Sequence, residues 1–170
     1  MEADFYLRPY RPSDINFIRN SWSSSYYKGA DFVHFLSPNE FNRQHRPVRE
    51  ALLSKPNATV IVACGKRDDD LLLGWILVEK TNDPGIHLHY IYVKEAFKGE
   101  GIFYELLDKA LPEKPIMVTH MTDRARKIIR KKKKDYFKDF VFAPDTIMVR
   151  YQYLNTLPRS EEWFLKNGQE

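Results

Sequence analysis

One segment constrains this chain most, because in it a strand pattern ends, a loop with two glycines follows, and a helix pattern begins. Ile91-Tyr92-Val93 is strand-like, Gly99 and Gly101 lie in the loop, and residues 102–111 carry apolar side chains at helical spacing. Such a loop presents consecutive backbone N–H groups, and the helix N-terminus adds a partial positive charge. The segment therefore predicts a pyrophosphate-binding unit, although a Gly-x-Gly turn can also serve only to join a strand to a helix.

Two common nucleotide motifs do not fit this loop. No Gly-Lys-Ser/Thr follows the glycines, so it is not a Walker A loop. The third glycine of the dinucleotide fingerprint is also missing, since Phe103 stands after Gly101 and Ile102. The loop therefore matches neither of these two motifs.

Strand and helix patterns alternate along the rest of the chain in the order β-α-α-β-β-β-α-β-α-β-β, which predicts a mixed α/β sheet flanked by helices. We expect one domain over residues 1–157 and a peripheral tail over 158–170. Ser13 is the predicted cap of a first helix that ends at Trp22, and Ser37 caps a second one. The aromatic residues between them predict a loop: Tyr26, Tyr27, Phe32, His34 and Phe35.

Composition narrows the class of protein. A chain of 170 residues with 43% hydrophobic residues suits one compact domain with a sizeable core. The single cysteine, Cys64, cannot form an internal disulfide, and no Cys/His cluster has zinc spacing. No run approaches the roughly 20 apolar residues of a membrane span, and the N-terminus lacks the pattern of a secretory signal. A cytoplasmic location without a membrane is the expectation.

The glycine loop resembles the acetyl-CoA motif of the GNAT (GCN5-related N-acetyltransferase) superfamily, Gln/Arg-x-x-Gly-x-Gly/Ala. Lys98 stands at the Gln/Arg position and Gly101 at the central glycine, whereas Phe103 replaces the usual small residue. The opening Leu7 to Asp14 and the pair Gly74-Trp75 also resemble this superfamily. The resemblance implies acetyl-CoA as cofactor, held by Ile91, Tyr92, Val93, Lys98, Gly99, Glu100, Gly101, Ile102, Phe103 and Thr122.

A second resemblance concerns His87-Leu88-His89, which is similar to the His-x-His strand of arylalkylamine N-acetyltransferases. By position, His87 and His89 are implied to remove a proton from the acceptor amine, with His89 favoured as the nearer to the thioester. Residues i and i+2 of a strand face one side, and a histidine titrates near neutral pH, so both could serve as bases in one cleft. Two histidines on a half-exposed sheet face are the alternative, and a metal site is weakly supported because no third ligand is evident.

The residue that protonates the leaving thiolate is the least defined part of the implied catalytic set. Ala125 and Thr122 occupy the family positions that precede a catalytic tyrosine, but Ile129 falls where that tyrosine is expected. Tyr136 is the nearest tyrosine and is our catalytic candidate, although a core or edge position is the alternative. His120, at the end of the predicted strand 116–120, is a further candidate for the cleft.

The formal net charge of +4 is concentrated in one helix pattern, between Arg124 and Lys134. A charge run usually forms a solvated face. Some of these residues could reach a phosphate of coenzyme A. An alternative function is nucleic-acid binding or DNA modification through Arg130, Lys131, Lys132, Lys133 and Lys134. A GNAT-shaped binding module without activity is the third interpretation, and either a monomer or a homodimer is expected.

Overall fold

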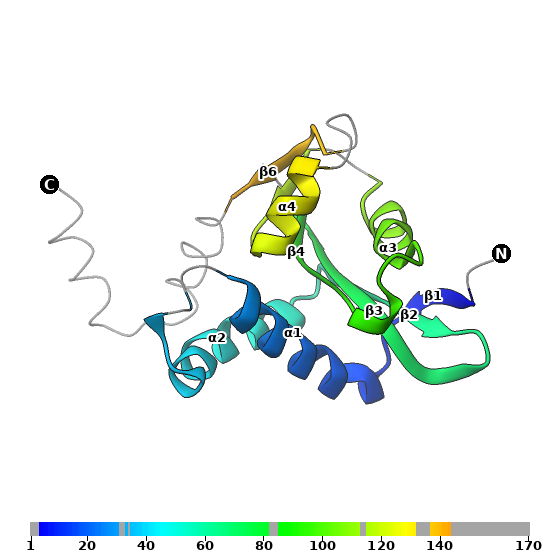
Figure 1. The fold of residues 1–170 in the computed structure, drawn as a ribbon, viewed down its shortest axis with the longest axis horizontal. Coiled ribbons are helices and arrows are strands. Elements are labelled where there is room, and N and C mark those ends of the chain that lie inside the picture. The colour runs from blue at the N-terminus through cyan, green and yellow to red at the C-terminus, as the bar shows by residue number, and fades with distance from the viewer. Residues whose placement is uncertain are drawn as a thin grey trace, which may run out of the picture.

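The computed structural model describes residues 4–30, 33, 35–81, 85–112, 115–131 and 137–143 (Figure 1). The predicted order of elements is confirmed through the last strand of this part. The strand predicted over 147–154 and the boundary at residue 158 lie outside the described residues. The elements are β1 (Phe5–Pro9), α1 (Ile15–Gly29), α2 (Pro38–Leu53), β2 (Ala58–Gly65), β3 (Asp68–Lys80), β4 (Ile86–Val93), α3 (Ile102–Ala110), β5 (Ile116–Val118), α4 (Asp123–Lys131) and β6 (Phe140–Phe142).

The six strands form one mixed sheet in the order of the sequence. Strands β1 to β4 are antiparallel, whereas β4 pairs in parallel with β5 and β5 in parallel with β6. The parallel step requires a crossover, which α3 supplies between β4 and β5. The pairing of β4 with β5 ends at Leu88 and Val118, whereas β4 itself continues to Val93. The two strands therefore separate, and we call this place the strand split.

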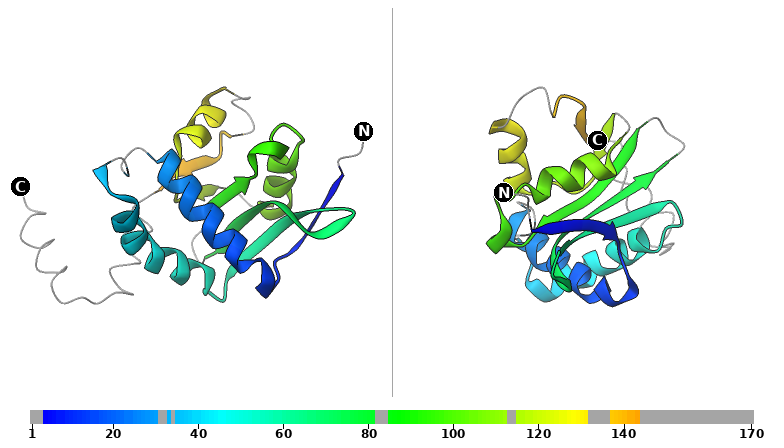
Figure 2. Two further views of the ribbon diagram at one scale, coloured as in Figure 1. Left: turned by 60° about the horizontal axis from the view of Figure 1, so that its bottom comes forward. Right: turned by 90° about the vertical axis from the view of Figure 1, so that its right-hand side faces the viewer.

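Helices cover both faces of the sheet (Figures 1 and 2). On one face α1 and α2 pack with a core that contains Trp22, Phe41 and Trp75. On the other face α3 packs Ile102 and Leu106 against the apolar side of β3 and β4. Two layers of helix around one sheet leave the strand split as the opening in the molecule.

Helix α1 is two turns longer than predicted, because the prediction ended it at Trp22. Tyr26 continues the apolar stripe of Ile18 and Trp22 at a spacing of four residues, and it is buried. The serines between these residues do not break the helix, since Ser25 Oγ donates a hydrogen bond back to the Ser21 carbonyl at 2.5 Å. Tyr26 and Tyr27 therefore belong to a helix and not to the predicted loop.

The helix starts and strand ends also differ in detail from the prediction. Asp14, rather than Ser13, precedes α1, and its carboxylate accepts hydrogen bonds from the Arg8 side chain and the Arg11 backbone N–H, both at 2.7 Å. Ser37 caps α2 as predicted, with the Glu40 N–H donating to its Oγ at 3.2 Å. Strand β5 ends at Val118 instead of His120, because the chain turns away at the strand split.

Candidate active site

A cleft of about 900 Å³ opens at the strand split. Its walls come from α1, from the last residues of β4, from the loop that follows β4, and from the first residues of α3 and α4. Three separate stretches of the sequence, namely α1, the continuous segment from β4 to α3, and the start of α4, thus meet around one space. A volume of this size accommodates a ligand as large as a nucleotide cofactor.

The structure brings the predicted cofactor residues together in this cleft. All of them except Glu100 lie in its walls: Ile91, Tyr92, Val93, Lys98, Gly99, Gly101, Ile102, Phe103 and Thr122. Phe103, the departure from the family motif, is half-buried and packs its ring edge-on against Tyr104 with centroids 5.4 Å apart. Its side chain contributes to the wall and leaves the cleft open.

Two glycines give the loop before α3 its shape. Gly99 and Gly101 have φ angles of 98° and 86°, in the left-handed region that favours glycine. A Cβ atom at either position would meet nothing within 4 Å, so the backbone conformation and not crowding requires glycine there. Within the described ranges, the N–H groups from Gly99 to Phe103 have no backbone acceptor. They form an anion-binding surface at the N-terminus of α3.

Three charged side chains stand beside this loop. The Lys98 ammonium pairs with the Glu95 carboxylate, and Arg124 of α4 donates to the same carboxylate at 3.3 Å. Burial lowers the pKa of Lys98, and the Arg124 charge lowers it further. All three residues line the cleft, so an entering anion would meet two cations that now share one carboxylate.

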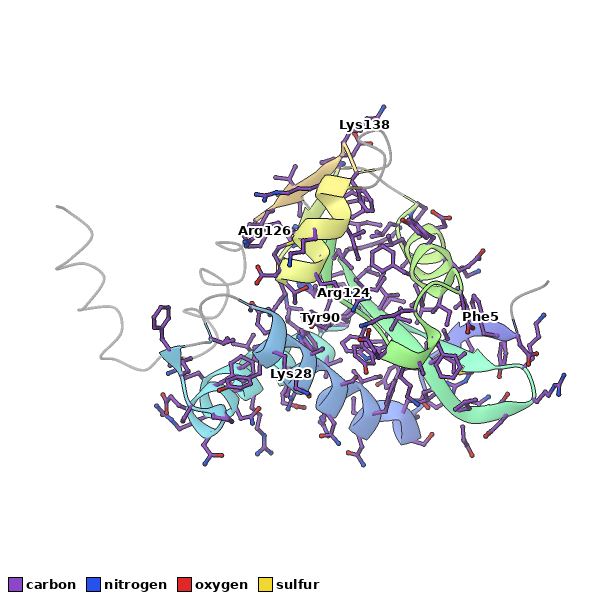
Figure 3. All side chains as sticks on the ribbon, viewed as in Figure 1. Phe5, Lys28, Tyr90, Arg124, Arg126 and Lys138 are labelled. Atoms are coloured by element: carbon purple, nitrogen blue, oxygen red, sulfur yellow. The ribbon has the colours of Figure 1, made fainter. Side chains whose placement is uncertain are left out.

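The wall opposite α3 is polar and comes from α1. Ser21, Ser24, Ser25 and Lys28 line the cleft at the spacing of one helix face. Tyr90 of β4 lies across from them, and its hydroxyl is 2.9 Å from Ser25 Oγ. Figure 3 shows Lys28, Tyr90 and Arg124 arriving from α1, β4 and α4 around this space. Burial raises the pKa of Tyr90, which keeps its phenol protonated.

His87 and His89 lie on one side of β4, as predicted, with ring centroids 6.2 Å apart. They are not among the residues that line the cleft, and their exposed fractions are only 3% and 2%. A register shift between Leu77 and Val78 opposite β4 pairs Leu77 with Tyr90 and Val78 with Leu88. His89 is thus the extra residue of a β-bulge. The bulge shifts the alternation of side chains along β4 by one residue, so that Tyr90 lines the cleft.

His89 is held at both ring nitrogens. Its Nε2 is 2.8 Å from the Glu79 carboxylate, and its Nδ1 is 2.9 Å from Thr119 Oγ1. Burial lowers the pKa of His89, and Glu79 offsets this only in part. Burial would raise the pKa of Glu79, but the hydrogen bonds from His89 and Lys55 outweigh it and lower that pKa to about 2. The role of His87 and His89 as bases stays a prediction.

The remaining predicted site residues divide between the described and undescribed parts. Arg130 and Lys131 belong to α4, and Arg130 is exposed. Lys132, Lys133 and Lys134 lie outside the described residues, as does Tyr136. Their predicted roles in nucleic-acid binding and catalysis stay predictions.

Sequence reasoning did not identify Glu79, Thr119, Tyr90 and Ser25, which surround the strand split. One signal was available for Glu79. It is the only acidic residue between Leu71 and Lys80, and it directly follows an apolar run that ends at Val78. A buried acid in a central strand needs partners, and a histidine on the next strand is the natural one. The bulge that moves Tyr90 into the cleft leaves no such signal.

This chain has a mixed sheet that opens between two parallel strands, beside a glycine loop at a helix N-terminus. This combination is typical of the acetyltransferase fold. The family model described as "Acetyltransferase (GNAT) family" matches residues 16–114. This is more than half of the chain, and the chain belongs to this family.

Solved structures support the same fold. A candidate acetyl transferase from Pyrococcus furiosus is similar with a TM-score of 0.52 and 21% identity, over 76% of this chain and 93% of that one. The YycN protein of Bacillus subtilis reaches a TM-score of 0.57 at 13% identity, over 75% and 89% of the two chains. A Corynebacterium glutamicum protein, named "histone acetyltransferase HPA2 and related acetyltransferase", reaches 0.55 at 14%, over 75% and 83%. At these identities the likeness shows the fold.

Three further findings concern the length of the matched structures, the curated proteins, and features that the described residues lack. The chain spans 62% of the length of some other GNAT-family structures that it matches. Among curated proteins, none matches the sequence significantly. In the described ranges, no helix has the length and apolar character to cross a bilayer, and no three His, Cys, Asp or Glu side chains group as a metal site would require.

Proposed function

We propose that this chain is an acetyl-CoA-dependent N-acetyltransferase that acts on a primary amine. The observation that carries the proposal is the cleft at the strand split, where the glycine loop, the open edge of β4 and the cations Lys98 and Arg124 face one space. Each feature suits one part of an acyl-CoA.

The fit to the cofactor rests on unsatisfied groups of the protein. The N–H groups of Gly99 to Phe103 would hold the pyrophosphate, and Lys98 and Arg124 would balance its charge. Beyond Leu88, the side of β4 that faced β5 has lost its strand partner, so its backbone is free to pair with the amides of the pantetheine arm. Acetyl-CoA supplies the thioester carbon that the amine nitrogen attacks.

The acceptor would enter along α1. Ser24 and Lys28 are exposed at this wall, and the Ser25–Tyr90 pair stands deeper in the cleft. The amine must lose a proton before it attacks, and His89 and His87 remain our candidates for that step, acting from beneath the strand split. Direct transfer requires no acyl-enzyme, which agrees with the raised pKa of the buried Cys64 thiol.

Calorimetric titration with acetyl-CoA tests the proposal. We expect saturable one-to-one binding, and release of free thiol when phenylethylamine, spermidine or a lysine-containing peptide is added with acetyl-CoA. Arg124→Ala removes a cation that lines the cleft. Its matched control is Arg126→Ala, because Arg126 pairs with Asp123 within α4 and does not line the cleft. Absence of binding at millimolar acetyl-CoA would overturn the proposal.

A further inference from the structure

Four buried polar side chains form a continuous hydrogen-bonded chain that runs from β3 through β4 to the residues that follow β5, at the strand split. Glu79 of β3 meets His89 Nε2 at 2.8 Å, His89 Nδ1 meets Thr119 Oγ1 at 2.9 Å, and Thr119 Oγ1 meets His120 Nδ1 at 3.1 Å. All four residues are buried, with exposed fractions between 2% and 6%. Leu88 and Val118 are the last paired residues of β4 and β5, so His89 and Thr119 are the first residues beyond the strand split.

The proton on each atom follows from the order of these contacts. Glu79 is ionised and can only accept, so the neutral His89 donates to it from Nε2–H. Nδ1 of His89 is then bare and accepts the Thr119 hydroxyl proton at 2.9 Å, a shorter contact than the 3.5 Å from Thr119 Oγ1 to the Leu88 carbonyl oxygen. Because that hydroxyl has a single proton, His120 must donate to it from Nδ1–H. Nε2 of His120 is consequently the bare nitrogen at the open end of the chain.

His120 is not itself among the residues that line the cleft, but its ring stands edge-on to Tyr90, which is, with centroids 6.4 Å apart. Thr122, two residues after His120, lines the cleft as well. Trp22 and Tyr26 of α1 pack their rings against His120 at 5.4 and 5.0 Å and fix its orientation.

We propose that Glu79, His89, Thr119 and His120 are a proton relay, and that the bare Nε2 of His120 takes up the proton that the acceptor amine releases. This inference rests on the proposed function. It moves the entry point of the proton from His89 to His120 and makes His89 an internal member. Thr119 and Glu79 become positioning residues that set the tautomers of the two histidines.

The transfer balances in protons and charge. The ammonium of the acceptor gives one proton to His120 Nε2 and becomes a neutral amine. His120 passes its Nδ1 proton to Thr119 Oγ1, and Thr119 passes its own proton to His89 Nδ1. The positive charge then lies on His89, whose Nε2–H faces the Glu79 carboxylate, so the charge ends beside the anionic member of the relay.

Several titratable groups face the relay. Lys55, which follows α2, donates to Glu79 at 2.9 Å and reduces the attraction of Glu79 for a proton on His89. His87 of β4 lies beside His89, and His45 of α2 has its ring 5.6 Å from His120. Tyr26 and Tyr90 stay protonated because burial raises their pKa values. Burial, then the neighbouring His45 and His89, lowers the pKa of His120, and a hydrogen bond to the His89 backbone offsets this only in part, so the ring is neutral at neutral pH.

The tautomers can be measured without any substrate. Long-range ¹H–¹⁵N spectra of the imidazoles at pH 8, assigned with His89→Gln and His120→Gln, should show His89 protonated at Nε2 and His120 at Nδ1. Thr119→Val should shift His120 toward the Nε2–H tautomer, whereas Thr119→Ser should retain the wild-type pattern. Either histidine in the opposite tautomer in the wild-type chain overturns the relay, even if Thr119→Val does not fold.

The kinetic arm uses whichever amine of the panel the wild-type chain acetylates. Thr119→Val should lose about 100-fold in kcat/KM and change the acidic limb of the pH profile, with acetyl-CoA affinity unchanged, and Thr119→Ser should stay within about threefold. Wild-type kinetics in Thr119→Val would overturn proton transfer through Thr119. If the wild-type chain fails to bind acetyl-CoA, the proposed function fails, and the tautomers still uphold or overturn the hydrogen-bond order.

Discussion

Gly74 in β3 controls how closely β3 and β4 approach beside the cleft. A Cβ atom at this position would lie 2.6 Å from the Tyr92 carbonyl oxygen and 3.3 Å from Val93 Cα. Both neighbours are backbone atoms of the strand that lines the cleft, so a side chain at residue 74 would push the cleft wall itself. The family-like Gly-hydrophobic pair at this position thus has a packing reason.

We expect Gly74→Ala to lower the free energy of unfolding by about 1–3 kcal/mol, the usual cost of overpacking. Gly65→Ala is the control, because its Cβ atom would lie 3.3 Å from its nearest neighbours, one of which is a movable Leu71 methyl. Urea denaturation of both variants measures the difference. Equal losses would contradict the argument from close backbone approach.

His45 makes stability depend on pH for a reason separate from the relay. Its ring stacks on Phe41 with centroids 5.0 Å apart, and neither ring nitrogen has a hydrogen-bond partner among the residues that the structure describes. Burial, and then the Arg49 charge, lowers the pKa of His45 to about 3. As the pH falls below about 6.5, the unfolded chain binds a proton at this residue and the folded chain does not, so folding loses stability down to about pH 3.

We therefore expect His45→Phe to be more stable than the wild-type chain at acidic pH, by about 1.4 kcal/mol for each pH unit below about 6. His89 and His120 are present in both chains, so the difference isolates His45. Denaturation curves between pH 8 and pH 4.5 provide the measurement. Stability profiles that run parallel over this range would show that His45 is not buried as a neutral ring.

At the scale of elements, regular patterns in the sequence predicted most of the fold. Apolar periodicity and glycine placement identified the strands, α3 and the glycine loop before it, because these depend on local conformation and on one buried face. The length of α1 was wrong because serines suit both loops and the polar side of a helix, and only packing against Tyr90 decides between them. The position of His89 beneath the cleft was not predictable, since a bulge depends on the register with a partner strand.

Helix α4 allows a direct comparison of two arginines. Arg124 lines the cleft and bonds to Glu95 at 3.3 Å, whereas Arg126 bonds to Asp123 of its own helix at 3.4 Å. We expect Arg124→Ala to weaken acetyl-CoA binding about fivefold, equal to about 1 kcal/mol, and Arg126→Ala to leave it unchanged. Calorimetry at low and at 1 M salt measures this. The difference should shrink at high salt, because exposed charges are screened, and equal affinities at low salt would remove Arg124 from the site.

At the scale of the whole molecule, the two hydrophobic cores and helix α4 meet at the strand split. The core between the sheet and α1 and α2 contains Trp22 and Trp75, and the core under α3 contains Leu106. The residue that precedes α4 packs against the end of α1, because a Cβ atom on Gly29 would lie 3.1 Å from Thr122 Cβ. A ligand in the cleft would contact α1, β4, α3 and α4 together and would therefore stabilise their relative arrangement.

Acetyl-CoA at about 100 times its dissociation constant should therefore add about 2.7 kcal/mol to the free energy of unfolding. For a chain of this size that corresponds to a rise in Tm of about 5–10 °C. Amide hydrogen exchange should slow at Gly99 to Phe103 and along Ile91 to Val93. Exchange in β1 and β2, which lie at the opposite edge of the sheet from the strand split, should change little. Protection confined to β1, β2 or α2 would mean that the ligand binds elsewhere, because those elements contribute no residue to the cleft.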